Sequence, residues 1–145
     1  MKFATKTLVL GLVMVGGIAL AQSKATDPDV HARQVLMDGN GGAIGLLGGM
    51  AKGEKAFDAV AAEAAKQTLI ANAADIAAKF KTNASDPESR AKAELWDNLD
   101  EFATYAGNLG KAAAALDTSS LDGVKAGLGA IGGACKECHT EYKAS

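Results

Sequence analysis

Apolar residues recur at helical spacing through four segments of the chain, and polar residues separate these segments. The segments run from Thr26 to about Lys52, from Phe57 to about Thr82, from Ser85 to about Leu116, and from Leu121 to about Lys143. None of them shows the sustained alternation of apolar and polar residues that a strand requires. Four helices joined by short polar loops predict an all-α chain folded as an antiparallel four-helix bundle.

Two of these segments begin with clear helix-start signals. Thr26-Asp27-Pro28 places a capping residue before a proline, which suits the first turn of a helix. Ser85-Asp86-Pro87-Glu88 has the Ser-to-Glu spacing of a capping box and also contains a proline. We therefore expect the third helix to begin directly at this second signal.

Length and charge limit what this chain can be. Its 145 residues are 48% hydrophobic and 22% charged, which suits one domain with a substantial core and argues against disorder. Two cysteines are too few for a disulfide-rich scaffold. The net charge is −2, so the chain has no basic footprint and we expect no nucleic-acid partner.

Residues 1–21 have the organisation of a secretory signal peptide. Two lysines supply the basic start, Leu8 to Leu20 is an uncharged apolar run, and Ala19-Leu20-Ala21 is a small-x-small cleavage site. The apolar run is shorter than the ~20 residues of a comfortable membrane span. We expect cleavage after Ala21, leaving a mature domain of residues 22–145 with no membrane span.

Glycine recurs at four-residue intervals in two of the segments, at Gly41, Gly45 and Gly49 and at Gly123, Gly127, Gly129 and Gly133. Each glycine inside a helix costs about 1 kcal/mol relative to alanine. Residues four apart share a helix face, and glycine lets a backbone or a flat ligand approach closely. We expect the first and last helices to enclose a flat group or to pack tightly; the alternative is a break of the first helix at residues 39–42.

Cys135-Lys136-Glu137-Cys138-His139 is C-x-x-C-H, the attachment pattern of c-type haem. Residues three and four apart lie on one side of a helix, so both sulfurs and the imidazole can face one flat macrocycle. In this arrangement the thiols form thioethers with the haem vinyl groups, and His139 binds the iron from the proximal side.

Three other uses of this motif are weaker. A thioredoxin-like dithiol needs a βαβ context, and the chain offers no predicted strand. A zinc site needs four ligands, and His31 is the only other histidine. A disulfide between two cysteines on one helical turn would constrain little. Export favours haem, because c-type haem is attached outside the bacterial cytoplasm.

The C-x-x-C-H motif on the last helix is followed by Tyr142 and a basic residue, Lys143. With this motif at its C-terminal end, the mature chain resembles the class II cytochromes c, the group of cytochrome c′ and its low-spin relatives. The stretches Ala32-Arg33-Gln34, Met50-Ala51-Lys52-Gly53-Glu54 and Leu95-Trp96 look like further landmarks of the family. Lys143 stands where the family often has arginine. The resemblance implies a four-helix bundle over residues 22–145, with one covalently bound haem c on the C-terminal helix.

Met37 lies one helical turn after Arg33. The resemblance places it at the distal side of the haem, where low-spin relatives have methionine and high-spin cytochromes c′ have a side chain that does not bind iron. We expect Met37 to be the distal ligand, with ordinary core packing as the alternative. Arg33 and Gln34 would border the haem, with Arg33 able to pair with a propionate.

The axial ligands determine the expected function. Iron held by histidine and methionine suits a periplasmic carrier that transfers single electrons between redox partner proteins. Five-coordinate iron held by His139 alone suits a cytochrome c′ that binds nitric oxide or carbon monoxide. No nucleophile with a positioned base is apparent, so we expect no enzyme activity. The resemblance is compatible with a monomer or a homodimer.

Overall fold

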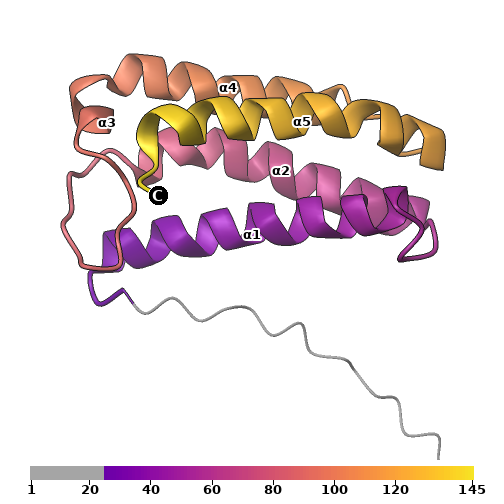
Figure 1. Cartoon of the computed structure of the whole chain (residues 1–145), viewed down its shortest axis with the longest axis horizontal. Coiled ribbons are helices and arrows are strands. Elements are labelled where there is room, and N and C mark those ends of the chain that lie inside the picture. Colours follow the sequence, from indigo (N-terminus) through magenta and orange to yellow (C-terminus); the bar gives the residue numbers. More distant parts are fainter. Residues whose placement is uncertain (1–24) are drawn as a thin grey trace, which may run out of the picture.

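The computed structural model describes residues 25–145. Its helices are α1 (Pro28–Ala51), α2 (Ala59–Lys79), the single turn α3 (Glu94–Asp97), α4 (Leu99–Ala114) and α5 (Leu121–Tyr142). The four long helices lie side by side and alternate in direction, which confirms the predicted all-α four-helix bundle (Figure 1). The predicted signal peptide, residues 1–21, lies outside the described residues.

Side-chain caps explain where three of the helices begin. Asp27 accepts hydrogen bonds from the backbone N–H groups of Asp29 and Val30, at 2.9 and 3.1 Å. Asp58 caps α2 in the same way, and the Ser120 hydroxyl accepts from Gly123 N at 3.1 Å at the start of α5. These oxygens satisfy N–H groups that have no partner within the helix. The first start signal, at Thr26-Asp27-Pro28, is thus confirmed.

The second start signal is wrong. Residues 86–89 form only a tight turn, closed by a hydrogen bond of 2.9 Å from Ser89 N to Asp86 O, and α4 does not begin until Leu99. The Asp86 carboxylate binds across the molecule instead, accepting from Thr26 N at 2.8 Å and from Asp27 N at 3.0 Å. The segment therefore serves as a connection between distant parts of the chain rather than as the start of a helix.

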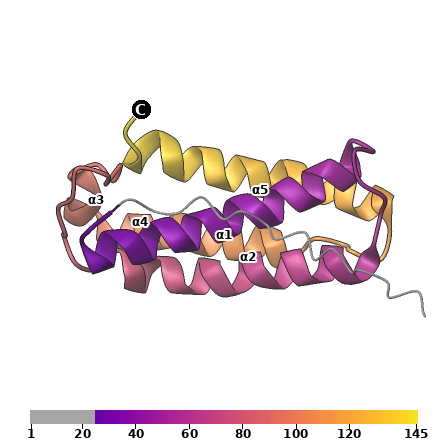
Figure 2. The ribbon, with the colours of Figure 1, turned by 90° about the horizontal axis from the view of Figure 1, so that it is seen from below.

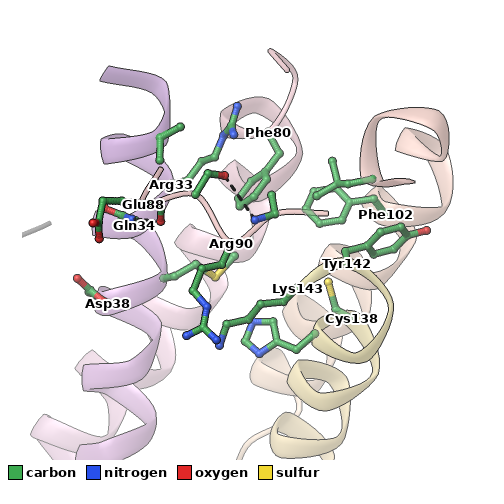
Figure 3. Close-up of a pocket in the computed structure, with 16 residues that line it drawn as sticks. Arg33, Gln34, Asp38, Phe80, Glu88, Arg90, Phe102, Cys138, Tyr142 and Lys143 are labelled. Carbon is green, nitrogen blue, oxygen red and sulfur yellow. Dashed lines mark hydrogen bonds between the residues drawn. The ribbon is translucent and has the colours of Figure 1, made fainter. Parts of the chain in front are cut away.

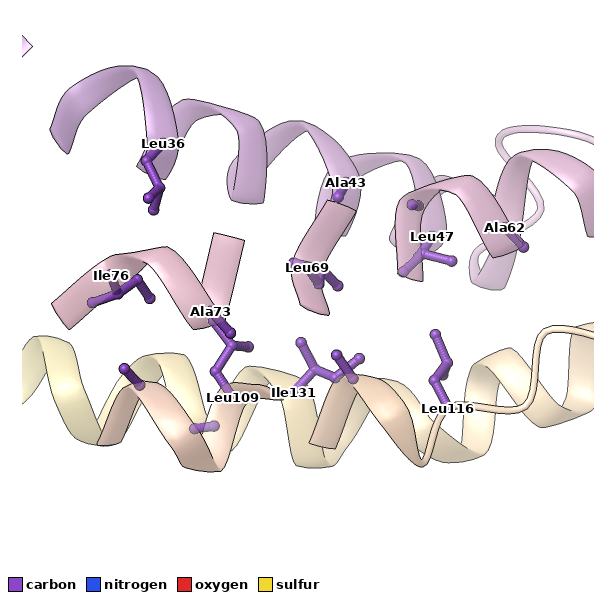
Figure 4. Close-up of a cluster of buried hydrophobic side chains, with 14 of the residues drawn as sticks. Leu36, Ala43, Leu47, Ala62, Leu69, Ala73, Ile76, Leu109, Leu116 and Ile131 are labelled. Atoms are coloured by element: carbon purple, nitrogen blue, oxygen red, sulfur yellow. The ribbon is translucent and has the colours of Figure 1, made fainter. Parts of the chain in front are cut away.

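The core is built mainly from leucine, isoleucine and alanine. Figure 4 shows side chains of α1 and α2 meeting those of α4 and α5 in one cluster. Its fully buried members include Leu47, Leu69, Leu116 and Ile131, each at most 1% exposed. Burying such side chains is the main source of stability for a domain of this size.

Glycines within one series can have different surroundings, since a Cβ added at Gly129 or Gly133 on α5 would meet no atom within 4 Å. A Cβ added at Gly127 would lie 2.5 Å from the Leu116 side chain, and one at Gly123 would lie 2.6 Å from Asp117. Tight packing therefore explains the glycines at the start of α5. A Cβ at Gly41 or Gly45 would meet no atom within 4 Å, so the prediction of close packing is wrong for these two positions. Helix α1 runs without a break through residues 39–42.

Helices α1 and α5 are in contact but diverge along their length. Figures 1 and 2 both show them closer together where α1 ends, and furthest apart where α1 begins and α5 ends. Among the described residues, no helix has the length and apolar character needed to cross a bilayer.

Candidate functional site

A cavity of about 560 Å³ opens between the beginning of α1 and the end of α5 (Figure 3). This volume is within the range of binding sites for small organic ligands and cofactors. Its lining is largely apolar, with Val30, Phe80, Leu95 and Phe102 on the inner wall. Polar and charged side chains lie around them, so the cavity suits a ligand that is mostly apolar but carries charged groups.

Helix α5 supplies the chemically reactive wall. Cys138, His139, Tyr142 and Lys143 line the cavity, while Cys135, one turn earlier, is half-buried and packs against the core. Burial raises the pKa of the Cys138 thiol to about 11, and it raises that of Cys135 as well. A redox-active dithiol needs a lowered thiol pKa, so this environment does not suit one.

The imidazole of His139 lies in an environment that favours its neutral form. Its pKa is lowered mainly by burial and also by the positive charge of Lys143. A neutral imidazole nitrogen can bind a metal, whereas a protonated one cannot.

Helix α1 supplies the facing wall. Arg33, Gln34 and Met37 all line the cavity, because residues three and four apart lie on one side of a helix. Met37 is half-buried and contacts the core. The structure thus brings Met37 and His139 to the same cavity from different helices.

Arg33 is the most deeply buried charged residue of the site, at 3% exposed. Its Nε donates to Lys79 O at 3.1 Å, and its Nη2 donates to Thr82 O. The guanidinium lies over the rings of Phe80 and Trp96, with its central carbon 5.0 and 5.3 Å from their centroids.

One nitrogen of this guanidinium remains without a partner. Arg33 Nη1 is buried and makes no hydrogen bond with any residue from 25 to 145. A buried, charged donor without a partner is unfavourable, so an anionic group from a ligand would satisfy it. An apolar cavity lined by one thiol, with a second thiol one helical turn away, a neutral imidazole and one unpaired cationic donor fits a haem and its propionates.

The connection from residue 81 to residue 93, hereafter the strap, closes one side of the cavity. Gln34 Nε2 donates to Glu88 O at 2.9 Å, which holds the strap against α1. At its other end, Ala144 N donates to Arg90 O at 2.8 Å and Lys92 N donates to Tyr142 O at 2.9 Å. These backbone bonds hold the strap against the C-terminal end of α5.

Aromatic side chains pack against one another on the inner wall of the cavity. Phe102 packs against Phe80 and Tyr142, with ring centroids 5.1 and 5.4 Å apart. The Tyr142 hydroxyl donates to Glu101 at 2.8 Å. Burial, followed by this hydrogen bond, raises the pKa of Tyr142 to about 12. The tyrosine is therefore a neutral, fixed wall of the site.

Most residues singled out in the sequence meet here, but the strap does not follow from the sequence. Figure 3 shows Arg90 projecting between α1 and α5, near Lys143. Arg90 lies in a segment that the start signal assigns to a helix, so sequence reasoning gives it no role. His31 is exposed and lies outside the cavity lining.

Comparison with known proteins gives consistent matches along the chain. The family model described as Cytochrome C′ matches residues 29–143. Cytochrome c-556 of Agrobacterium fabrum strain C58 is 32% identical, over 99% of this chain and 95% of its own length. Cytochrome c′ of Cereibacter sphaeroides is 31% identical, over 95% of this chain and 97% of its own length. A structural model of oxidised cytochrome c556 from R. palustris, validated by NMR, superimposes with a TM-score of 0.74 at 28% identity, over 81% of this chain and 97% of the other.

Proposed function

The chain belongs to the cytochrome c′ family, and on that premise we propose that it carries single electrons with His139 and Met37 as the axial ligands of its haem iron. It is a mono-haem c-type cytochrome whose cofactor is covalently attached haem c. Bound haem supplies a reversible one-electron change of its iron between the ferrous and ferric states.

Cys135 and Cys138 would hold the cofactor through thioether bonds, and His139 would bind its iron. These residues form the C-x-x-C-H motif, and Cys138 and His139 line the cavity. Arg33 would pair with a propionate through Nη1, and Gln34, which fastens the strap, would border the haem. Arg90 and Lys143 add two further positive charges at the cavity.

The observation that supports an electron carrier is the position of Met37. It is a thioether on the α1 wall of a cavity whose α5 wall carries His139. A methionine ligand closes the iron to exogenous ligands and raises its reduction potential. The protein has no catalytic role in this proposal.

Residues 1–21 support the cellular location that we propose. They have the organisation of a signal peptide, so the mature domain of residues 22–145 works in the periplasm and exchanges electrons with redox partner proteins there. The mature domain has thirteen Lys and Arg against seventeen Asp and Glu, a net charge of −4, because the leader contains two lysines and no acidic residue.

A five-coordinate cytochrome c′ that binds nitric oxide or carbon monoxide is the second candidate. The comparisons favour it almost equally, since a cytochrome c′ is 31% identical to this chain and a cytochrome c-556 is 32% identical. In this alternative, Met37 is a packing residue of the cavity wall.

Visible absorption spectra of the holoprotein, with and without carbon monoxide, distinguish the two functions. We expect a sharp, split band in the reduced protein and slow carbon monoxide binding. Substituting Met37→Leu keeps the apolar volume and removes the sulfur. If the methionine-bound form makes up roughly 99% of molecules, this change raises the apparent carbon monoxide affinity about 100-fold.

Met50→Leu is the matched control. Met50 is also on α1, but it is 2% exposed and lies outside the cavity lining. We expect its spectrum and carbon monoxide binding to match those of the wild type. Equal, rapid carbon monoxide binding by the wild type and Met37→Leu would instead establish the open iron of the second candidate.

A further inference from the structure

A buried polar contact joins α1 and α2 next to the turn that carries Met37. Asn40 on α1 is 5% exposed, and Asn72 on α2 is half-buried. The neighbouring contacts between these helices are made by apolar side chains such as Leu36, Ala43 and Leu69. Two amides in such a setting are unusual, because buried polar groups contribute less to stability than apolar ones of similar size.

Helix α1 accepts two hydrogen bonds from the Asn72 amide and leaves space for it at Gly39. Asn72 Nδ2 donates to Leu36 O at 3.2 Å and to Asn40 Oδ1 at 3.0 Å. A Cβ at Gly39 would lie only 3.0 Å from the same nitrogen. Glycine at this position therefore allows a close approach, and residues 36, 39 and 40 together form a socket for one side chain.

Such a socket fixes the position of α1 in a way that the apolar contacts do not. Apolar contacts are not directional and so distinguish neighbouring positions of a helix weakly, whereas a buried hydrogen bond is lost when the helix moves. A shift of one residue along an α-helix corresponds to a translation of about 1.5 Å and a rotation of about 100°. Buried asparagine pairs specify helix register in other helical assemblies for this reason.

Met37 depends on this register because its own side chain does not fix its direction. Methionine has three rotatable bonds and adapts to its surroundings. Leu36 and Asn40, which bind Asn72, are the residues immediately before and three after it. The direction in which α1 presents the sulfur is thus determined one turn away, on the face that contacts α2.

We propose that Asn72 is a positioning residue for the distal ligand, acting through Leu36, Gly39 and Asn40 of α1. This inference rests on the proposed role of Met37. Asn72 itself does not line the cavity. Its function is to hold the beginning of α1 in the single register in which Met37 faces the site.

The test is Asn72→Ala in the holoprotein, measured by visible spectroscopy and carbon monoxide association. We expect a mixture of closed and open iron, with carbon monoxide association about tenfold faster, the rise that follows when the open form increases from roughly 1% to roughly 10%. Hydrogen exchange by mass spectrometry should also become faster in residues 36–41 than in α5.

The double variant Asn40→Leu/Asn72→Ala distinguishes an effect on the position of Met37 from an effect on the stability of the protein. This double variant leaves no amide unsatisfied and restores apolar contact, so its thermal midpoint should recover toward that of the wild type. We expect its iron to remain partly open. Recovery of the closed spectrum together with stability would overturn the positioning role.

Lys66→Ala is the matched control on α2. It removes the bond from Lys66 Nζ to Leu116 O, at the end of the bundle away from the cavity, and should lower stability without opening the iron. An opening as large as that in Asn72→Ala would overturn the inference. If Met37→Leu opens the iron and Asn72→Ala does not, only the positioning role of Asn72 is wrong. If neither variant changes the spectrum, the proposed role of Met37 is wrong as well.

Discussion

The two ends of the bundle are built from the same four helices but are packed in opposite ways. At the end where α4 meets α5, Leu116 is 1% exposed and covers Gly127 so closely that an added Cβ would lie 2.5 Å away. At the other end, α1 and α5 separate around a cavity of about 560 Å³ (Figures 1 and 3). The comparison indicates that the closely packed end supplies the stability, which offsets the cost of the cavity and of the buried Arg33 at the open end.

Leu116→Ala, at the dense end, should have the largest effect on stability. The side chain is fully buried in the cluster of Figure 4, and truncating such a leucine costs about 3 to 4 kcal/mol once the resulting void is included. Chemical denaturation of the holoprotein measures this loss. The visible spectrum should not change, and an altered spectrum would show that the two ends are not independent.

Arg33→Met tests the open end and should have the second largest effect. It removes the donor to Lys79 O, whereas Thr82 O still accepts from Trp96 Nε1 at 3.1 Å. One carbonyl loses its donor, and we expect a loss of about 1 to 2 kcal/mol. Unlike Leu116→Ala, this variant should also lower the reduction potential, because removing a positive charge near the haem favours the ferric state.

Arg33→Lys is the matched variant for this prediction. It retains the charge but loses the planar fork that donates to two carbonyls and stacks on Phe80. Stability should therefore fall, while the potential stays close to that of the wild type. A potential that falls equally in both variants would contradict the electrostatic role of Arg33.

The fold could be predicted from sequence wherever the deciding interactions are local. The caps at Asp27 and Ser120 bond within their own helices, and apolar spacing identified the four long segments. The signal at residues 85–88 failed because Asp86 binds Thr26, sixty residues away, and no local pattern reveals that partner. Gly123 and Gly127 pack tightly, whereas Gly41 and Gly45 do not, and only the arrangement of the helices determines this difference.

The site divides in the same way. The C-x-x-C-H motif has a fixed spacing on one helix and stands out in the sequence, whereas Met37 is singled out only by the resemblance to the class II cytochromes c. Arg90 reaches the cavity only because the strap is tied to both α1 and α5. The Asn72 socket combines residues of two helices, and nothing in the local sequence marks them as a pair.

Lys66→Met, again at the dense end, should have a smaller effect. The ammonium donates to Leu116 O at 2.8 Å, near the end of α4, and losing this half-buried bond should cost about 1 kcal/mol. Lys125→Met, on an exposed part of α5, is the matched control and should change stability less. Equal losses in the two variants would show that the bond from Lys66 contributes little to the dense end.

Asp86→Asn, which weakens the strap, should have the smallest effect near neutral pH, because asparagine keeps one oxygen acceptor. Backbone hydrogen bonds from Asp27 and Glu88 and contacts with Thr26 lower the pKa of Asp86 to about 2. A carboxyl whose pKa is lower in the folded state stabilises the fold above its unfolded pKa of about 3.9, and this contribution disappears as the pH falls toward 2. The difference in thermal midpoint between wild type and Asp86→Asn should therefore be constant above about pH 4 and shrink between about pH 4 and pH 2.

Asp75→Asn, an exposed change on α2, provides the baseline. If the gap between wild type and Asp86→Asn stayed constant down to pH 2, the charge of Asp86 would have no part in fastening the strap, which its other hydrogen bonds would then hold.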